Sequence, residues 1–188
     1  MKMSIFLLLF VLMFFGATGV GVAASTSPTT ERVSRAQARA FERAKLSVRE
    51  ALGQAERRGT VIDIAFAVEH GRPVYHVKTY QNSTVWEGTL DASTGTLLGS
   101  GKSTPESQLD REDQAELAGL KDAKVKLDAA IESAERQIGG RAITAGLEER
   151  DGKIIYELKI VNPASVLPVT ISPGTGELKL GAPEPYTR

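Results

Sequence analysis

An internal repeat constrains this chain more than any other feature of its sequence. Residues 47–98 and 125–180 show the same order of patterns: a short amphipathic helix, three strand-like runs and a closing Thr-Gly turn. The segment 55–57 matches 134–136 at an offset of 79 (134 − 55), and the later matches fall at an offset of 81 (152 − 71). Because repeats of this length are structural units, we interpret the chain as a tandem pair.

The pattern inside each copy predicts an α+β unit. Ser47 and Glu50 form a capping-box signature, in which each side chain satisfies a free backbone N–H at the start of a helix. Apolar residues then alternate along three runs separated by turn residues, which is typical of an antiparallel meander. We therefore expect two tandem repeats, each an α-helix packed on a three- to four-stranded antiparallel sheet.

The repeat resembles the PepSY domain, an exported module named for its occurrence in peptidase propeptides. The resemblance depends on the Ala-x-x-x-Ala-Glu core of the helix, on the turn-plus-tyrosine segments 70–75 and 151–156, and on the closing Thr-Gly turns. The second copy departs from the first, with Ser172 in place of Asp91 and Lys126 in place of the capping Ser47. The resemblance implies a non-enzymatic module that binds peptidases as a propeptide-like inhibitor or regulator.

Residues 1–24 have the pattern of an export signal. Lys2 is followed by an uncharged stretch, and Val22-Ala23-Ala24 offers small residues at a cleavage site before Ser25. We expect a periplasmic or extracellular protein. The alternative is an uncleaved membrane anchor formed by residues 3–24, since about 20 apolar residues span a bilayer. The chain has no cysteine, which excludes disulfides, thiol catalysis and a lipid-modified N-terminus.

The remaining segments follow from composition and from the position of the repeats. We expect a tether and helix-prone lead-in at 25–44, a first repeat at 45–100, a linker with an acidic helix at 101–122, a second repeat at 123–181 and a tail at 182–188. The chain carries 23 Lys and Arg residues against 23 Asp and Glu residues, which gives no electrostatic reason to expect nucleic-acid binding.

No pattern in the sequence predicts catalysis, a cofactor or a metal site. His70 falls in a turn and His76 on the outward side of a strand, and neither has the three or four convergent ligands that metal sites need. Glu148, Glu149 and Asp151 lie near a turn, where carboxylates are ordinarily solvated. We therefore expect that the protein is not an enzyme.

Partner binding remains the predicted activity, with a peptidase or an envelope complex as the partner. A small α+β module can add an extended segment of its partner to an exposed sheet edge. We first select the outward residues of the second strand in each repeat as candidate contacts, namely Arg72, His76, Lys78, Lys153, Glu157 and Lys159. The alternative function is that of an accessory subunit of a larger envelope or membrane complex, held by the N-terminal anchor.

Overall fold

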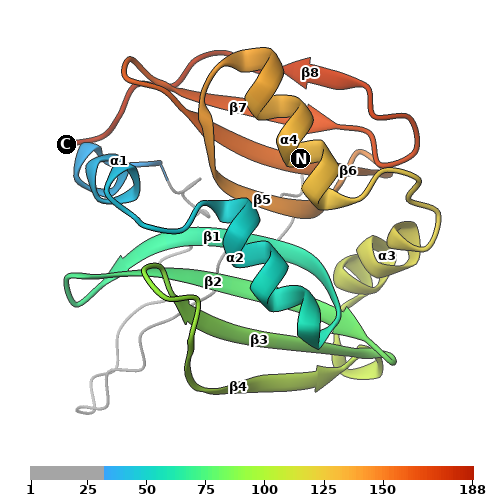
Figure 1. Cartoon of the computed structure of the whole chain (residues 1–188). Helices are drawn as coiled ribbons and strands as arrows, with labels where there is room; N and C mark the ends of the chain where they lie inside the picture. Colours follow the sequence, from blue (N-terminus) through green and yellow to red (C-terminus); the bar gives the residue numbers. More distant parts are fainter. Residues whose placement is uncertain (1–31) are drawn as a thin grey trace, which may run out of the picture.

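Alternating apolar residues and tight turns build two four-stranded meanders in the computed structural model, which describes residues 32–188 (Figure 1). The strands of the first meander are β1 (Thr60–Glu69), β2 (Arg72–Gln81), β3 (Thr84–Asp91) and β4 (Leu97–Pro105). Those of the second are β5 (Arg141–Arg150), β6 (Lys153–Val161), β7 (Val166–Ile171) and β8 (Leu178–Leu180). The predicted export signal, residues 1–24, lies outside the described residues.

The two meanders join into one antiparallel sheet with the strand order β4-β3-β2-β1-β5-β6-β7-β8. The link consists of three residue pairs, Asp63 with Gly146, Ile64 with Ala145, and Ala65 with Thr144. We call this link the β1–β5 junction. The α+β class is confirmed, but the structure has a single eight-stranded sheet where the sequence analysis expected one sheet for each repeat. The difference arises because β1 and β5 pair with each other instead of remaining free edges.

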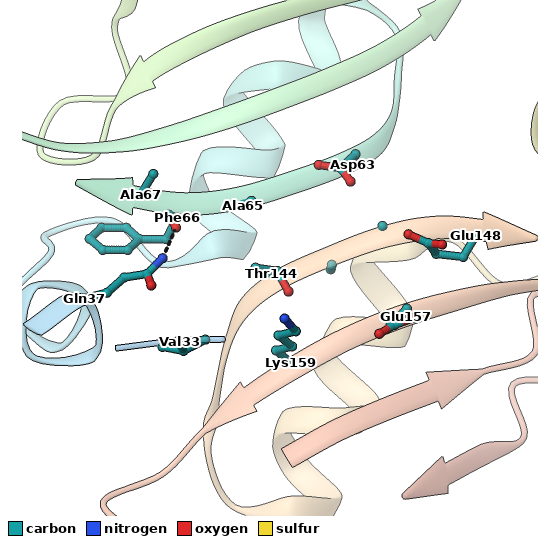
Figure 2. Close-up of a pocket in the computed structure, with 12 residues that line it drawn as sticks. Val33, Gln37, Asp63, Ala65, Phe66, Ala67, Thr144, Glu148, Glu157 and Lys159 are labelled. Atoms are coloured by element: carbon teal, nitrogen blue, oxygen red, sulfur yellow. Dashed lines mark hydrogen bonds between the residues drawn. The ribbon is translucent and has the colours of Figure 1, made fainter. Parts of the chain in front are cut away.

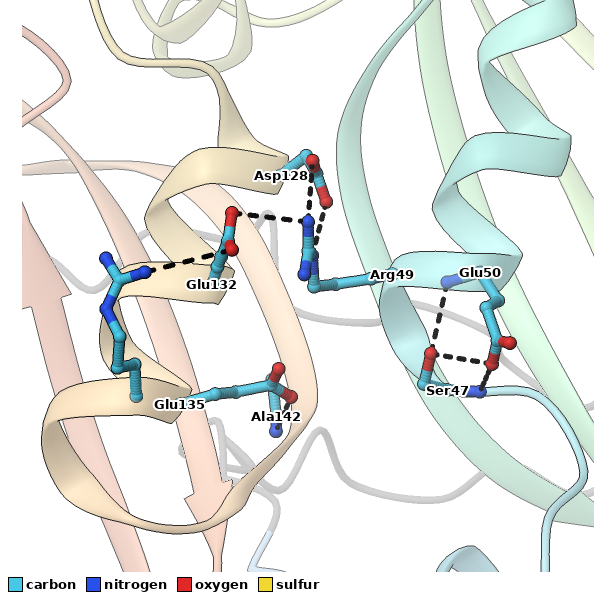
Figure 3. Close-up of polar contacts among 8 residues, drawn as sticks. Ser47, Arg49, Glu50, Asp128, Glu132, Glu135 and Ala142 are labelled. Atoms are coloured by element: carbon cyan, nitrogen blue, oxygen red, sulfur yellow. Dashed lines mark hydrogen bonds and ion pairs between the residues drawn. The ribbon is translucent and has the colours of Figure 1, made fainter.

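Helices α2 (Val48–Ala55) and α4 (Leu127–Ile138) lie side by side on one face of the sheet (Figure 1). Their apolar stripes bury Leu52 and Ile131 in a core that they share with Tyr75 and Tyr156. The predicted capping box is confirmed, because Ser47 and Glu50 each bond the backbone N–H of the other (Figure 3). The sheet therefore carries a continuous helical layer over its middle strands.

An ion pair links the two helices directly. The Arg49 Nε atom lies 2.7 Å from Asp128 Oδ1, and its Nη2 atom lies 3.4 Å from Glu132 Oε2 (Figure 3). The hydrogen bond to Asp128 raises the pKa of Arg49. Because these side chains are one third to one half exposed, the pair contributes more to the alignment of the helices than to stability.

Two further helices lie at the two ends of the β1–β5 junction (Figure 1). At one end, α1 (Arg35–Glu42) inserts Phe41 between Phe66, at 5.1 Å between ring centroids, and the Arg141 guanidinium, at 4.6 Å. At the other end, α3 (Arg111–Leu120) packs Leu117 against Ile62. The short 3-10 turns η1 (Glu56–Arg58) and η2 (Glu106–Gln108) complete the described elements.

Three details differ from the sequence expectations. A bulge between Val61 and Asp63 turns Val61 toward the main core, while Ile62, which strict alternation with Ile64 would place there, packs in a second small cluster. Strand β4 continues to Pro105, through residues 101–105 that were expected to form a linker. The tail 182–188 is docked by backbone pairing of Glu184 with Val166 and of Thr187 with residues near α1.

The described helices are short. Within residues 32–188, no helix is long and apolar enough to span a lipid bilayer.

Replacement of Phe41 by alanine tests whether α1 belongs to the core. Phe41 is fully buried, so we expect Phe41→Ala to lower the free energy of unfolding by about 3–5 kcal/mol in a denaturant titration. Leu180→Ala is the control, because Leu180 is 56% exposed and its loss should cost under about 0.5 kcal/mol. An unchanged midpoint for Phe41→Ala would show that α1 packs loosely.

The buried tyrosines of the two meanders provide a matched pair. The Tyr75 hydroxyl donates to the Leu46 carbonyl at 2.6 Å, and the Tyr156 hydroxyl donates to the Val125 carbonyl at 2.9 Å. Burial raises the pKa of both phenols. Because each change leaves a carbonyl without its donor, Tyr75→Phe and Tyr156→Phe should each cost about 1–2 kcal/mol of unfolding free energy. A loss confined to one of them would mean that the two contacts are not equivalent.

Candidate functional site

The sheet face opposite α2 and α4, which we call the far face, carries the polar side chains of the central strands. Side chains alternate between faces along a strand, so Asp63, Ala65 and Ala67 of β1 point away from the core residues Ile64 and Phe66. The same alternation places all six candidate residues of β2 and β6 on the far face. The predicted side chains therefore share one surface.

Strand pairing arranges this surface in rows that cross the sheet. One row runs Glu87, Lys78, Asp63, Gly146 and Glu157, from β3 to β6. The next row runs Thr89, His76, Ala65, Thr144 and Lys159. The β1–β5 junction thus brings candidate residues of the two meanders into common rows, although they are far apart in sequence.

The β2 candidates differ in their surroundings. Arg72 is exposed, and its Nε atom lies 3.6 Å from Asp91 Oδ2. The Nζ atom of Lys78 lies 3.9 Å from Glu87 Oε1. His76 was expected to be a solvated surface residue, but it is only 7% exposed. Its Nδ1 atom lies 3.2 Å from the Thr89 hydroxyl and its Nε2 atom 3.2 Å from Glu69. His76 is a packed and hydrogen-bonded residue because it lies in the middle of a wide sheet.

The β6 candidates divide in the same way. Lys153 is exposed at the start of the strand, and Glu157 pairs with Arg150. Lys159 was also selected as an outward residue, but it is only 4% exposed. As with His76, its position in the interior of the sheet results from the pairing of β1 with β5. Lys159 therefore occupies a buried position where an exposed one was expected.

The candidate strands are also not sheet edges. β2 pairs with β1 and β3, and β6 pairs with β5 and β7, so neither has a free row of backbone groups. The edge strands are β4, which is nine residues long, and β8, which is three residues long. Strand addition of the predicted kind would have to use one of these.

Asp63 is the functional candidate that the sequence analysis missed. Alternation along β1 places its side chain on the far face, yet it is only 8% exposed. Burial raises its pKa to about 6, with the Lys78 ammonium opposing and the Glu87 carboxylate adding to that shift. The available sequence signal was a single acid in the middle of the apolar run 61–66, which is unusual in a central strand.

A small cavity opens over the β1–β5 junction beside Asp63 (Figure 2). Its volume is about 60 Å³. The acidic lining comprises Asp63, Glu148 and Glu157, and an apolar part near α1 is lined by Val33, Ala65 and Ala67. Within residues 32–188, no group of three His, Cys, Asp or Glu side chains is arranged to hold a metal ion. The chemistry offered here is recognition of charge in a partly apolar setting.

Comparison with known proteins gives a family match for part of the first meander and the helix before it. Residues 45–100 match the PepSY family, described as "Peptidase propeptide and YPEB domain". That segment contains α2 and strands β1 to β3, and it ends within β4. No curated protein matches the chain. A crystal structure of a candidate lipoprotein from Clostridium difficile 630 is 18% identical, with a TM-score of 0.42, and covers 73% of this chain and 93% of its own.

Asp63→Asn tests the environment of the buried acid. The pKa of Asp63 is higher in the folded than in the unfolded protein, so the folded state holds this proton more tightly. Stability should therefore fall as pH rises from about 4 to about 6 and then remain lower by about 3 kcal/mol. The amide of the Asp63→Asn variant cannot ionise, so at pH 7 the variant should be more stable than wild type by up to about that amount.

The control for this measurement is Asp122→Asn, at an exposed position. Urea titrations of the three proteins between pH 4 and pH 7 supply the free energies of unfolding. Parallel pH profiles for wild type and Asp63→Asn would contradict the burial of a charged Asp63.

Proposed function

We propose that this protein is an exported, non-catalytic module that binds peptidases and regulates proteolysis in the cell envelope. The observation that carries the proposal is the match of residues 45–100 to the peptidase propeptide family. A propeptide acts by binding its peptidase and needs no catalytic groups of its own. The buried, hydrogen-bonded state of His76 agrees with a binding surface built from a rigid sheet.

We further propose that residues 123–181 form a second copy of the same unit. Both halves place a helix before a four-stranded meander, and both first strands contain a bulge, at Val61/Asp63 and at Ala142/Thr144. The hydroxyls of Tyr75 and Tyr156 bond carbonyls just before α2 and α4, respectively. Shared irregularities of this kind support common ancestry better than a shared strand count does, because bulges are specific features.

Strand addition along β4 is the proposed mode of binding. An edge strand offers unpaired backbone N–H and C=O groups to an extended segment of a partner. β4 is the longer of the two edges, and most of its side chains are exposed. Its exposed lysine, Lys102, is paired in register with Glu87. Of the six far-face candidates, Arg72 and Lys153 remain accessible as additional contacts.

The direct test of the function is capture of partners from the native cell envelope by chemical crosslinking, read by mass spectrometry. A peptidase as the dominant partner, inhibited by the purified full chain, is the expected result. Recovery of a membrane complex without a peptidase would contradict the proposal and favour an accessory subunit.

Ser100→Pro tests the binding mode. Ser100 lies between Gly99 and Gly101, which have φ values of +76° and +72°, and it has no partner in the register with β3. Proline is tolerated at edge bulges, so the fold should lose under about 1 kcal/mol. Loss of the N–H group and the added ring should weaken binding of the captured peptidase at least about tenfold.

The matched control is Ser100→Ala, which removes the same hydroxyl and keeps the N–H group. Its affinity for the peptidase, measured by isothermal titration, should equal that of wild type. If Ser100→Pro binds as tightly as Ser100→Ala, the partner does not use this edge.

A further inference from the structure

Asp63 is a buried acid without a hydrogen-bond partner among residues 32–188. The residue is more than nine-tenths buried, and the influences on its charge are burial itself, Lys78 and Glu87. Lys78 is its cross-strand neighbour, but the Lys78 ammonium lies 3.9 Å from Glu87 on the next strand. A carboxylate at the edge of a narrow, partly apolar cavity, with no hydrogen bond from the described residues, can accept one from a cation that enters the cavity.

Gly146 provides the room that this carboxylate occupies. Gly146 is the direct partner of Asp63 across the junction, and a Cβ atom at residue 146 would lie only 2.6 Å from Asp63 Oδ2. The next residue in the row, Glu157, is on the far side of Gly146, and neighbouring strands are about 4.8 Å apart. The missing side chain therefore lets the Asp63 carboxylate lie over residue 146, at the edge of a cavity that Glu148 and Glu157 also line (Figure 2).

We propose that this cavity binds the ammonium group of a lysine side chain against the Asp63 carboxylate. The lysine belongs to a partner polypeptide, and this part of the inference rests on the proposed function. The existence of a cation-binding pocket does not depend on that function. The ammonium donates hydrogen bonds to Asp63, which then gains the partner that it lacks within residues 32–188. This contact is charge-assisted and is therefore among the stronger hydrogen bonds.

The shape of the cavity agrees with a lysine. Ala65 and Ala67 follow Asp63 on the same face of β1 and continue toward Val33, so the cavity is acidic at one end and apolar at the other. Over the four residues from 63 to 67, a strand rises about 13 Å, which is longer than a lysine side chain. The aliphatic stem can therefore lie along the alanines while the charge reaches Asp63.

The arrangement of polar groups in the cavity favours an ammonium over a guanidinium. About 10–15 Å³ of cavity volume holds one water molecule. The 60 Å³ of this cavity therefore accommodates an ammonium group and the last methylene groups of a lysine side chain. The planar guanidinium is wider and needs donors satisfied along two edges. Lys159 also lines the cavity, but its ammonium points toward Thr144 in the neighbouring row (Figure 2). The end at Asp63 is therefore the part suited to a cation.

The test uses n-butylammonium chloride, an analogue of the lysine side chain, and the full chain. Backbone amide shifts are followed by NMR during titration, with sodium chloride at equal ionic strength and with 1-butanol as the uncharged analogue. We expect saturable shifts at residues 63–65 and 144–146, with a dissociation constant on the order of 1 mM. Neither sodium chloride nor 1-butanol should reproduce them.

Asp63→Asn and Asp122→Asn are the matched variants. The first should bind n-butylammonium at least about tenfold more weakly, because the charge that holds the ammonium is lost. The second removes an exposed acid and should bind like wild type. Equal affinity in Asp63→Asn and wild type, the same shifts with sodium chloride, or no saturable shift in wild type would each overturn the pocket.

The captured peptidase separates this inference from the proposed function. If n-butylammonium binds at the junction but no peptidase is captured, the ammonium-binding pocket is supported and the lysine comes from a protein that is not a peptidase. If a peptidase is captured and Asp63→Asn binds it as tightly as wild type, the partner does not insert a lysine there and the inference fails.

Discussion

The three residue pairs between β1 and β5 are the interaction on which the rest of this structure depends. Without them, each meander would be a four-stranded sheet with β1 or β5 as an exposed edge, and long exposed edges promote aggregation. With them, α2 and α4 come together over one core, and α1 and α3 lie at the two ends of the junction. At each end of this short junction a helix packs on the neighbouring residues of β1, α1 on Phe66 and α3 on Ile62.

The same junction determines where chemistry is available. It places Asp63 directly opposite Gly146, so a carboxylate lies beside a residue that offers no side chain to cover it. It also moves His76 and Lys159 from near expected edges to the interior of the sheet. Within residues 32–188 the edge strands become β4, which is nine residues long, and β8, which is three residues long. The described residues thus form a sheet with a packed centre and one long edge strand.

Local features of this fold could be predicted from the sequence, whereas the junction could not. The Ser47–Glu50 capping box depends on residues three positions apart, and it formed as predicted. Pairing of β1 with β5 depends on contacts some 80 residues apart, which no local pattern encodes. Ile62 shows the same limit on a smaller scale: strict alternation with Ile64 would place it in the main core, but a bulge turns it to the second cluster. The burial of Asp63 could not be predicted from the sequence because it depends on the long-range pairing of β1 with β5.

Amide hydrogen exchange at the junction, measured by NMR on the full chain, tests this account most directly. Protection reports the free energy of the opening that exposes each amide. If the junction holds one cooperative sheet, hydrogen-bonded amides within residues 63–65 and 144–146 should exchange as slowly as those in the centres of β2 and β6. Fast exchange at the junction, with β2 and β6 still protected, would mean that the halves fold separately, and it would contradict the single sheet.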